Sequence, residues 1–479
     1  MPKSILIVKQ NVSICEKCTI IFGFCIVLRP VCDYNKSTKY RIKKEKKGVL
    51  RRSKKQGAPC FGASAPKLFN GPRGGKMKKI SAIVSSLLLS SAMLSACAAP
   101  QTQEKIDYSL FPNYVEPSQA AYRFDFEQMV TPYFLGNVIY NETVMLVEEN
   151  GVISGKLQYE PVRVLSVRDH TWEKEYPASE YTVEKNVITM KEGGSLPYLA
   201  SENLYGINIP EPYREVTSIT NVETDWVLMG SSVYTEGSLI YGHQISVSYV
   251  YDVRDLNREE FAFYADTAYP KLKEKLKAGQ DVSIVVIGDS VAEGCSSSGH
   301  FNRAPYMETW AEQVEKGLNE AYEGKVTVKN VAVGGTQSEW GSAAAQINSV
   351  VENAPDLVLV HFGINDAGSG VTPSSYEANI EKLIVDVQAR VPACEFMLIK
   401  AFTPNTANYD PEQFRKYWVK LDNLAQEYED AYTLDMYTLS KTMLLQKKYM
   451  DVTGNGINHV NDFSSRLYTM NILSALIKY

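Results

Sequence analysis

The second half of the chain alternates short, continuous apolar runs with stretches of helical periodicity. The apolar runs are residues 284–287, 326–328, 357–360 and 396–399. The helical stretches are residues 306–322, 341–353, 374–391 and 411–428. Strands that are apolar on both faces must be covered on both faces, and strands joined by helices run parallel. The pattern therefore predicts a doubly wound, three-layer α/β/α domain with a parallel sheet, whose functional site lies outside the carboxyl ends of the strands.

The residues before this domain have the sequence pattern of β-strands. Short segments there alternate apolar and polar side chains, and turn signals that contain glycine separate them. The clearest strand candidates are residues 144–147, 162–167 and 244–250. Short alternating strands of this kind predict an all-β sandwich or jelly-roll domain, which we place at residues 111–255.

A change of period near residue 256 marks the boundary between the two predicted domains. Apolar residues recur three and four positions apart from Phe261 to Leu276, and Gly279 follows them. This spacing predicts an amphipathic linker helix that ends at Gly279. We therefore place the second domain, linker helix included, at residues 256–479.

Residues 77–97 have the pattern of a secretory signal peptide. A basic start at Lys78 and Lys79 precedes an apolar run, and the segment ends in Leu-Ser-Ala-Cys at Cys97. The apolar run of about 15 residues is short for a membrane span, which needs roughly 20. The ending resembles a bacterial lipobox, whose cysteine carries a lipid. This implies an exported protein, lipid-anchored at the bacterial cell surface through Cys97, with residues 98–110 as a tether.

Residues 1–76 precede this signal and hold 18 Lys and Arg against 3 Asp and Glu. A signal peptide is read at the N-terminus, so we expect residues 1–76 to be a disordered extension from a wrongly assigned start codon. Gly74-Gly75 stands just before Met77, and its codons can spell a bacterial ribosome-binding site. The alternative interpretation of this basic tract is a nucleic-acid-binding arm.

The rest of the chain is acidic. Residues 97–479 hold 30 Lys and Arg against 52 Asp and Glu. An acidic body repels phosphate backbones, which argues against nucleic acid as its partner. Only three cysteines fall in this part, and a lipid on Cys97 would leave at most one disulfide. We therefore expect the fold to rest on its hydrophobic core.

Four short polar blocks carry the candidate chemistry. The blocks are Gly288-Asp289-Ser290, residues 330–336, Gly363-Ile364-Asn365-Asp366 and Asn455-Gly456-Ile457-Asn458-His459. Each block alone has an ordinary interpretation, such as a helix cap, a turn, a loop or a structural histidine. Three of the blocks follow consecutive predicted strands. Because the carboxyl ends of parallel strands meet at one edge of a sheet, their order and placement favour a common site.

Together the four blocks resemble those of the SGNH, or GDSL, superfamily of esterases and lipases, over essentially the whole C-terminal domain. In that family the serine of the first block is the nucleophile and the histidine of the last block is the base, which implies Ser290 and His459 here. The resemblance also implies an oxyanion hole formed by the amide groups of Ser290 and Gly335 and by the side chain of Asn365. Gly334 is the alternative to Gly335.

These residue types suit acyl transfer. A serine hydroxyl needs a neighbouring base at neutral pH, and imidazole fits that task. The oxyanion of a tetrahedral intermediate needs donors that are aimed at it in advance. The mechanism implies no cofactor. No metal site is expected either, because the five histidines form no His-x-x-x-His pair and the Cys15 and Cys18 pair has no second pair at matching spacing.

One position departs from the family pattern. The family usually has an aspartate three residues before the catalytic histidine, where this chain has Gly456. The groups that could orient His459 instead are Asn455, Asp451, Asp462 or a backbone carbonyl in a Ser-His dyad. An asparagine could hold the tautomer of the ring, but it would stabilise the imidazolium less than a carboxylate does.

Further side chains have both a functional and a structural interpretation. His300, in the loop after Ser290, could reach a substrate. Trp340, beside Glu339, could stack on a sugar, although a tryptophan at a helix start more often packs against its neighbours. His361 precedes the third block on a buried strand and is expected in the core.

The resemblance and the predicted export together suggest an extracellular serine esterase that removes acyl groups, chiefly O-acetyl, from carbohydrate. The sequence shows no long apolar insertion that would form a lipase lid, and a β-domain before an SGNH domain resembles two-domain bacterial carbohydrate esterases. The expected partners are an acylated polysaccharide or oligosaccharide and, through the lipid on Cys97, a membrane. The alternatives are a broader lipase, arylesterase or thioesterase, or a non-catalytic glycan-binding lipoprotein.

Overall fold

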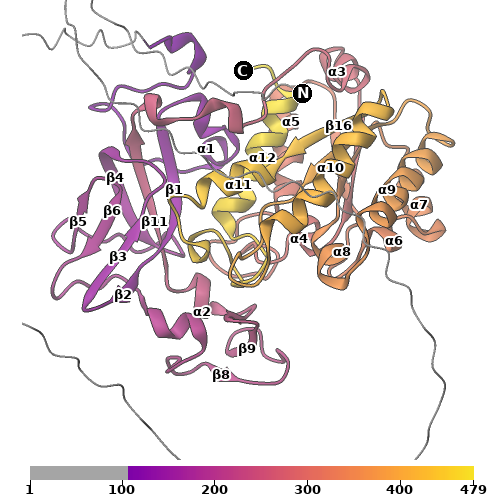
Figure 1. The fold of residues 1–479 in the computed structure, drawn as a ribbon. Coiled ribbons are helices and arrows are strands. Elements are labelled where there is room, and N and C mark those ends of the chain that lie inside the picture. Colours follow the sequence, from indigo (N-terminus) through magenta and orange to yellow (C-terminus); the bar gives the residue numbers. More distant parts are fainter. Residues whose placement is uncertain (1–105) are drawn as a thin grey trace, which may run out of the picture. The chain divides into compact units, whose positions relative to one another are not determined.

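The computed structural model describes residues 106–479 of the chain (Figure 1). The predicted extension, the signal at 77–97 with Cys97, and the first part of the tether lie outside the described residues. Within the described range, no helix is both long enough and apolar enough to cross a bilayer.

A five-stranded parallel sheet forms the centre of the C-terminal part. Its strands are β12 (Val282–Gly288), β13 (Val326–Asn330), β14 (Leu357–His361), β15 (Glu395–Lys400) and β16 (Ala431–Asp435). The order across the sheet is β13-β12-β14-β15-β16, and every neighbouring pair is parallel. The chain passes from β12 to β13 on one side of it, and then crosses to β14, β15 and β16 on the other side. The crevice at this switch point opens at the carboxyl end of β12, where ligands bind in such sheets.

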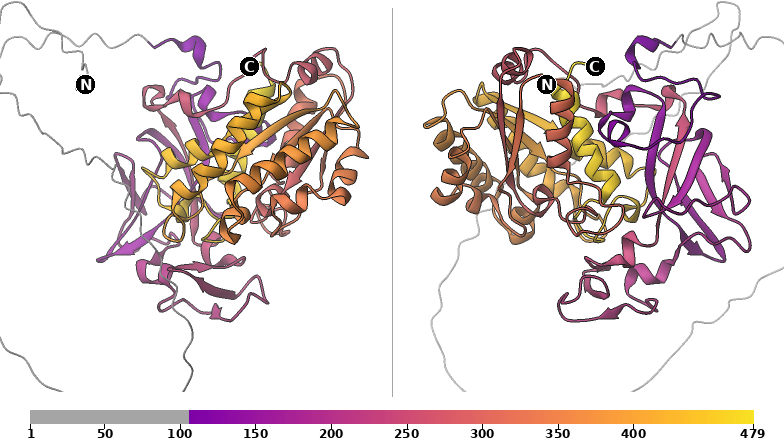
Figure 2. Two further views of the ribbon diagram at one scale, coloured as in Figure 1. Left: turned by 45° about the vertical axis from the view of Figure 1, so that its right-hand side comes forward. Right: turned by 180° about the vertical axis from the view of Figure 1, so that it is seen from behind.

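Helices cover both faces of this sheet, which confirms the predicted three-layer fold (Figure 2). The main helices are α5 (Trp310–Ala321), α7 (Ala344–Val351), α9 (Pro373–Gln388), α10 (Pro411–Glu427) and α12 (Asp462–Leu476). Helix α9 contacts α7 and α10 on one face, and α5 packs against α12 on the other. The sequence predicted α5 to begin near residue 306, but it begins at Trp310 because Thr309 and Glu312 form a capping box there.

The predicted linker helix over 261–276 is wrong in its first half. The observed helix, α3, spans only Pro270–Lys277. Proline is tolerated in the first turn of a helix but not in its interior, and Tyr269 before it takes a left-handed conformation. Phe261 is buried without being helical, and its ring stacks on Phe134 with centroids 4.0 Å apart. Its apolar character therefore reflects packing against the N-terminal part.

The N-terminal part is built from sheets that are mainly antiparallel, as predicted. One sheet has the order β1-β11-β4, with β1 (Val138–Met145), β4 (Pro161–Asp169) and β11 (Gln244–Tyr251). A second has the order β5-β6-β3-β2-β7, with β2 (Val147–Glu149), β3 (Val152–Lys156), β5 (Tyr181–Glu184), β6 (Val187–Met190) and β7 (Leu199–Ala200). A third, small sheet has the order β10-β9-β8, with β8 (Arg214–Glu215), β9 (Asp225–Met229) and β10 (Ser232–Tyr234).

The two parts pack on each other through apolar and buried polar contacts. A single hydrophobic cluster includes Ile139 of β1 and Leu473 of α12. The ammonium of Lys447 pairs with the carboxylate of Glu142, and both side chains are fully buried. Breaking such a pair leaves an uncompensated charge, so it holds the C-terminal loop firmly against β1. That loop carries the fourth polar block.

Candidate active site

Ser290 lies where the first strand of the parallel sheet turns into a helix. Strand β12 ends at Gly288, and helix α4 (Ser290–Glu293) begins two residues later. A side chain at residue 288 would lie 2.3 Å from the carbonyl oxygen of His361, so the turn needs glycine there. The Asp289 carboxylate accepts a hydrogen bond from the amide of Val291 and fixes the turn. Ser290 is thus presented at the carboxyl edge of the sheet.

His459 meets Ser290 from the C-terminal loop. Its Nε2 lies 2.8 Å from the Ser290 hydroxyl oxygen, and only 8% of His459 and 6% of Ser290 are exposed. The loop is shaped by Asn455, whose side-chain oxygen accepts hydrogen bonds from the amides of Ile457, Asn458 and His459. The ring is therefore fixed at a distance from which it can take the serine proton.

Glu236 of the N-terminal part contacts the other ring nitrogen of His459. It follows β10 in the small sheet, and its Oε1 lies 3.0 Å from Nδ1 of His459. This contact has the distance of an ion pair but falls short of a linear hydrogen bond. Sequence reasoning missed Glu236, because no motif surrounds it and it lies far from the fourth block in the chain.

The candidates that the sequence offered to orient His459 are wrong, since none of them contacts its ring. Asn455 instead donates a hydrogen bond of 3.2 Å to Oε1 of Glu236. The Asp451 carboxylate accepts from the amides of Met145 and Lys448. Asp462 accepts from the amide of Ser298. The nearest partner of Nδ1 is a carboxylate, so the backbone-carbonyl dyad is not the observed arrangement either.

The Glu236 carboxylate stays ionised in this setting. Its burial alone would raise its pKa, but the charge that His459 carries when protonated and the hydrogen bonds from Asn455 and Tyr234 outweigh burial. Together these lower the pKa of Glu236 to about 2. A negative charge therefore faces the imidazole throughout the neutral pH range.

The second and third blocks lie beside Ser290 and offer hydrogen-bond donors. The amide of Gly334 is already engaged, since it donates to the Glu293 carboxylate at 2.6 Å. Within residues 106–479, the amides of Ser290 and Gly335 donate no recorded hydrogen bond. The Asn365 amide uses one hydrogen on the carbonyl of Thr336 at 3.0 Å, which leaves its second hydrogen free. This geometry favours Gly335 over Gly334 as an oxyanion donor.

The remaining candidate side chains contact neighbours other than Ser290 and the ring of His459. His361 is fully buried, as expected, and bridges the Asp289 carboxylate and the hydroxyl of Tyr468. Trp340 packs edge-on against Phe362. His300 is exposed, near the Cys295 sulfur. In the described part of the chain, no group of three His, Cys, Asp or Glu side chains could hold a metal ion.

The backbone of Gly456 excludes the side chain that the family usually has there. Its φ is +85°, and a Cβ would lie 2.3 Å from the carbonyl oxygen of Val233. We predict that Gly456→Ala lowers the free energy of unfolding by about 3 kcal/mol, from backbone strain plus collision. Gly193 is the matched control, because its φ is +76° in open space. Gly193→Ala should lower the free energy of unfolding, measured with urea, by only about 1 kcal/mol. If both variants lose the same free energy of unfolding, the Cβ at residue 456 does not collide with Val233.

Known proteins resemble this chain at the level of one family model and several solved structures. Residues 286–462 match the model of the GDSL-like Lipase/Acylhydrolase family. No curated protein matches the chain. The structure of TesA is similar, with 22% identity, 32% of this chain and 76% of that chain covered, and a TM-score of 0.26.

Two further solved structures are described as carbohydrate esterases. One is a two-domain esterase, CEX, active on acetylated mannans, with 19% identity and a TM-score of 0.36. That alignment covers 45% of this chain and 54% of CEX, about half its length. The other is a catalytic mutant of Axe2, an acetylxylan esterase from Geobacillus stearothermophilus, with 18% identity, 41% of this chain and 94% of that chain covered, and a TM-score of 0.35.

Proposed function

The protein belongs to the GDSL/SGNH hydrolase family through its C-terminal part, and on this premise we propose that it removes acyl groups, chiefly O-acetyl, from carbohydrate. The observation that carries the proposal is the 2.8 Å contact between the Ser290 hydroxyl and Nε2 of His459 at the carboxyl edge of the sheet. Free donors on Ser290, Gly335 and Asn365 lie at the same edge.

The proposed reaction has two steps. His459 takes the proton of Ser290 as the serine oxygen attacks the ester carbonyl, and the same proton then leaves with the alcohol. The amides of Ser290 and Gly335 and the Asn365 side chain receive the oxyanion. Water, deprotonated by His459, then attacks the acyl group, and His459 returns the proton to the Ser290 oxygen as the acyl–oxygen bond breaks. Each donor to the oxyanion contributes about 3 kcal/mol to lowering the barrier.

The character of the rim supports a sugar ester as substrate. Val333, Gly334 and Gly335 beside Ser290 are exposed, and the Glu293 carboxylate is bonded to this loop. A long acyl chain needs a cleft lined by apolar side chains, whereas a small acyl group suits an open loop such as this one, on which Val333 is the one large apolar side chain. From the predicted export we propose that the substrate lies outside the cell.

The test compares acetate release with the hydrolysis of model esters by the purified protein. Acetylated mannan and acetylated xylo-oligosaccharides are the first substrates, beside aryl esters of short and long acids, with Ser290→Ala as control. Acetate release that disappears in Ser290→Ala would support the proposal. A preference for long acyl chains would replace it by a broader acylhydrolase. Glycan binding without hydrolysis, equal in both forms, would replace it by a binding lipoprotein.

We also propose a lipid on Cys97, which the lipobox-like ending at residues 94–97 motivates. Cells that express the protein and are fed an alkyne-tagged fatty acid should yield a labelled protein in the membrane fraction. Cys97→Ser should lose the label, and Cys295→Ser, the matched control, should keep it. A label that persists in Cys97→Ser would refute the anchor.

A further inference from the structure

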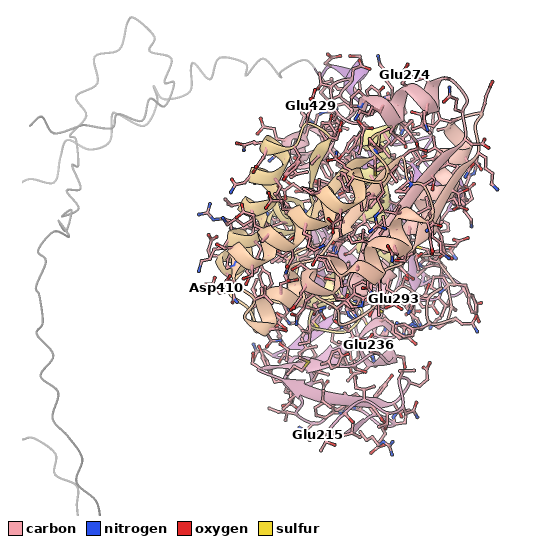
Figure 3. All side chains as sticks on the ribbon, turned by 90° about the vertical axis from the view of Figure 1, so that its right-hand side faces the viewer. Glu215, Glu236, Glu274, Glu293, Asp410 and Glu429 are labelled. Carbon is pink, nitrogen blue, oxygen red and sulfur yellow. The ribbon has the colours of Figure 1, made fainter. Side chains whose placement is uncertain are left out.

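We propose that Glu236 is the positioning residue for His459, so that the N-terminal part supplies the acidic member of the catalytic centre. The inference rests on the proposed esterase function and adds a residue that lies outside the four blocks. Figure 3 shows Glu236 between Glu293, on the helix that carries Ser290, and Glu215 of the small sheet. The contact that carries it is the 3.0 Å distance from Oε1 of Glu236 to Nδ1 of His459.

Glu236 is held in place on both carboxylate oxygens. Oε1 accepts hydrogen bonds from the Tyr234 hydroxyl at 3.0 Å and from the Asn455 amide at 3.2 Å. Oε2 accepts one from the Ser296 hydroxyl at 3.1 Å. These donors come from the small sheet, from the loop of His459 and from the loop after Ser290. A buried carboxylate with donors from three segments cannot swing away from the ring without leaving them unpaired.

The main chain around Glu236 is anchored as well. Its carbonyl oxygen accepts a hydrogen bond of 2.8 Å from the Arg303 guanidinium, which lies over the ring of Tyr241. The amide of Thr235 donates to the carbonyl of Asn455 at 3.2 Å. The segment that carries Glu236 is therefore bonded directly to the loop that carries His459.

The glycine at residue 456 and the position of Glu236 have the same structural cause, which is the course of strand β10. The carbonyl of Val233 occupies the space into which a Cβ of Gly456 would project. Strand β10 thus fills the place of the usual acidic side chain, and the chain that continues from β10 brings in Glu236 three residues later. The structure replaces a local carboxylate by one from another sheet.

Glu236 acts on His459 through its negative charge, and it forms or breaks no covalent bond in the reaction. A carboxylate facing Nδ1 keeps the proton on that nitrogen, so Nε2 is free to accept the proton of Ser290. When Nε2 gains that proton, the imidazolium lies beside a negative charge. The other groups that face Glu236 are the Tyr234 hydroxyl, the Cys295 thiol and the Arg303 guanidinium.

The test replaces the carboxylate by an amide of the same shape. Glu236→Gln should lower kcat between about 10²-fold and 10⁴-fold with little change in KM. Glu236→Asp keeps the negative charge on a shorter side chain. Its kcat should lie between those of the wild type and Glu236→Gln. Glu215→Gln, an exposed glutamate of the same part, should match the wild type.

The outcomes separate this inference from the proposed function. If Ser290→Ala abolishes turnover while Glu236→Gln keeps the wild-type kcat, Glu236 has no positioning role and the esterase stands. If the wild type hydrolyses no ester, the proposed function fails. The downfield resonance of the Nδ1 proton of His459 in the wild type then decides on Glu236, because its absence overturns the inference.

A measurement on the wild type covers the case in which Glu236→Gln does not fold. A proton on Nδ1 that faces a carboxylate exchanges slowly and resonates far downfield. We expect one such resonance in the protein with labelled histidine, and its loss in His459→Ala. If no resonance of this kind exists, the contact is not maintained in solution and the inference is wrong.

Discussion

Ser290→Ala is expected to lower kcat for a short aryl ester by about 10⁶-fold. The change removes the oxygen that would carry the acyl group, and no neighbouring hydroxyl contacts Nε2 of His459 in the described residues. Its effect on stability should be small, because alanine keeps the Cβ and only one hydroxyl is lost. The measurement is steady-state kinetics with equal amounts of folded protein, checked by circular dichroism and thermal unfolding.

Ser349→Ala is the matched control for this change. Ser349 lies on α7, away from the site, and its hydroxyl only donates to the carbonyl of Gln346. Its kcat should stay within about twofold of the wild type. Turnover by Ser290→Ala at more than a few per cent of the wild-type rate would show that another group is the nucleophile.

His459→Ala should cost nearly as much as Ser290→Ala, about 10⁶-fold in kcat. Without the base, the Ser290 hydroxyl keeps its proton and the leaving alcohol receives none. Because the two residues act as one unit, the double variant should be no slower than either single variant. The measurement is a double-mutant cycle on the same ester.

The control histidine for this cycle is His243, whose Nδ1 contacts the carbonyl oxygen of Leu239. His243→Ala should leave kcat within about twofold of the wild type. Losses of Ser290→Ala and His459→Ala that multiply in the double variant would mean that the two residues act independently, contrary to the proposed mechanism.

The C-terminal sheet could be predicted because its strands are apolar on both faces. A run such as residues 357–360 has no polar side to expose, so only a covered parallel sheet accommodates it. The helix over 261–276 could not be predicted correctly from spacing alone. Its apolar residues before Pro270 contact the N-terminal part, and a periodicity of three and four does not reveal which neighbour a side chain contacts.

The proximity of Ser290 and His459 follows from the family pattern, whereas the contact of Glu236 with His459 does not. Residues that end neighbouring strands are brought together by topology, and a motif marks them. Glu236 reaches the site because a separate small sheet folds over Gly456, which no local signal in the sequence encodes. Gly456 was the signal available, because the missing acid requires another partner for His459. Asn455, one of the four groups that the sequence offered, bonds the carboxylate instead of the ring.

The most direct test of the central claim is to trap the nucleophile. The protein is treated with a fluorophosphonate, which reacts with activated serines, and the modified residue is located by peptide mass spectrometry. We predict a single adduct on Ser290, absent in Ser290→Ala and formed far more slowly in His459→Ala. An active enzyme whose adduct lies on another residue, or that hydrolyses esters while Ser290 stays unmodified, would contradict a serine esterase centred on Ser290 and His459.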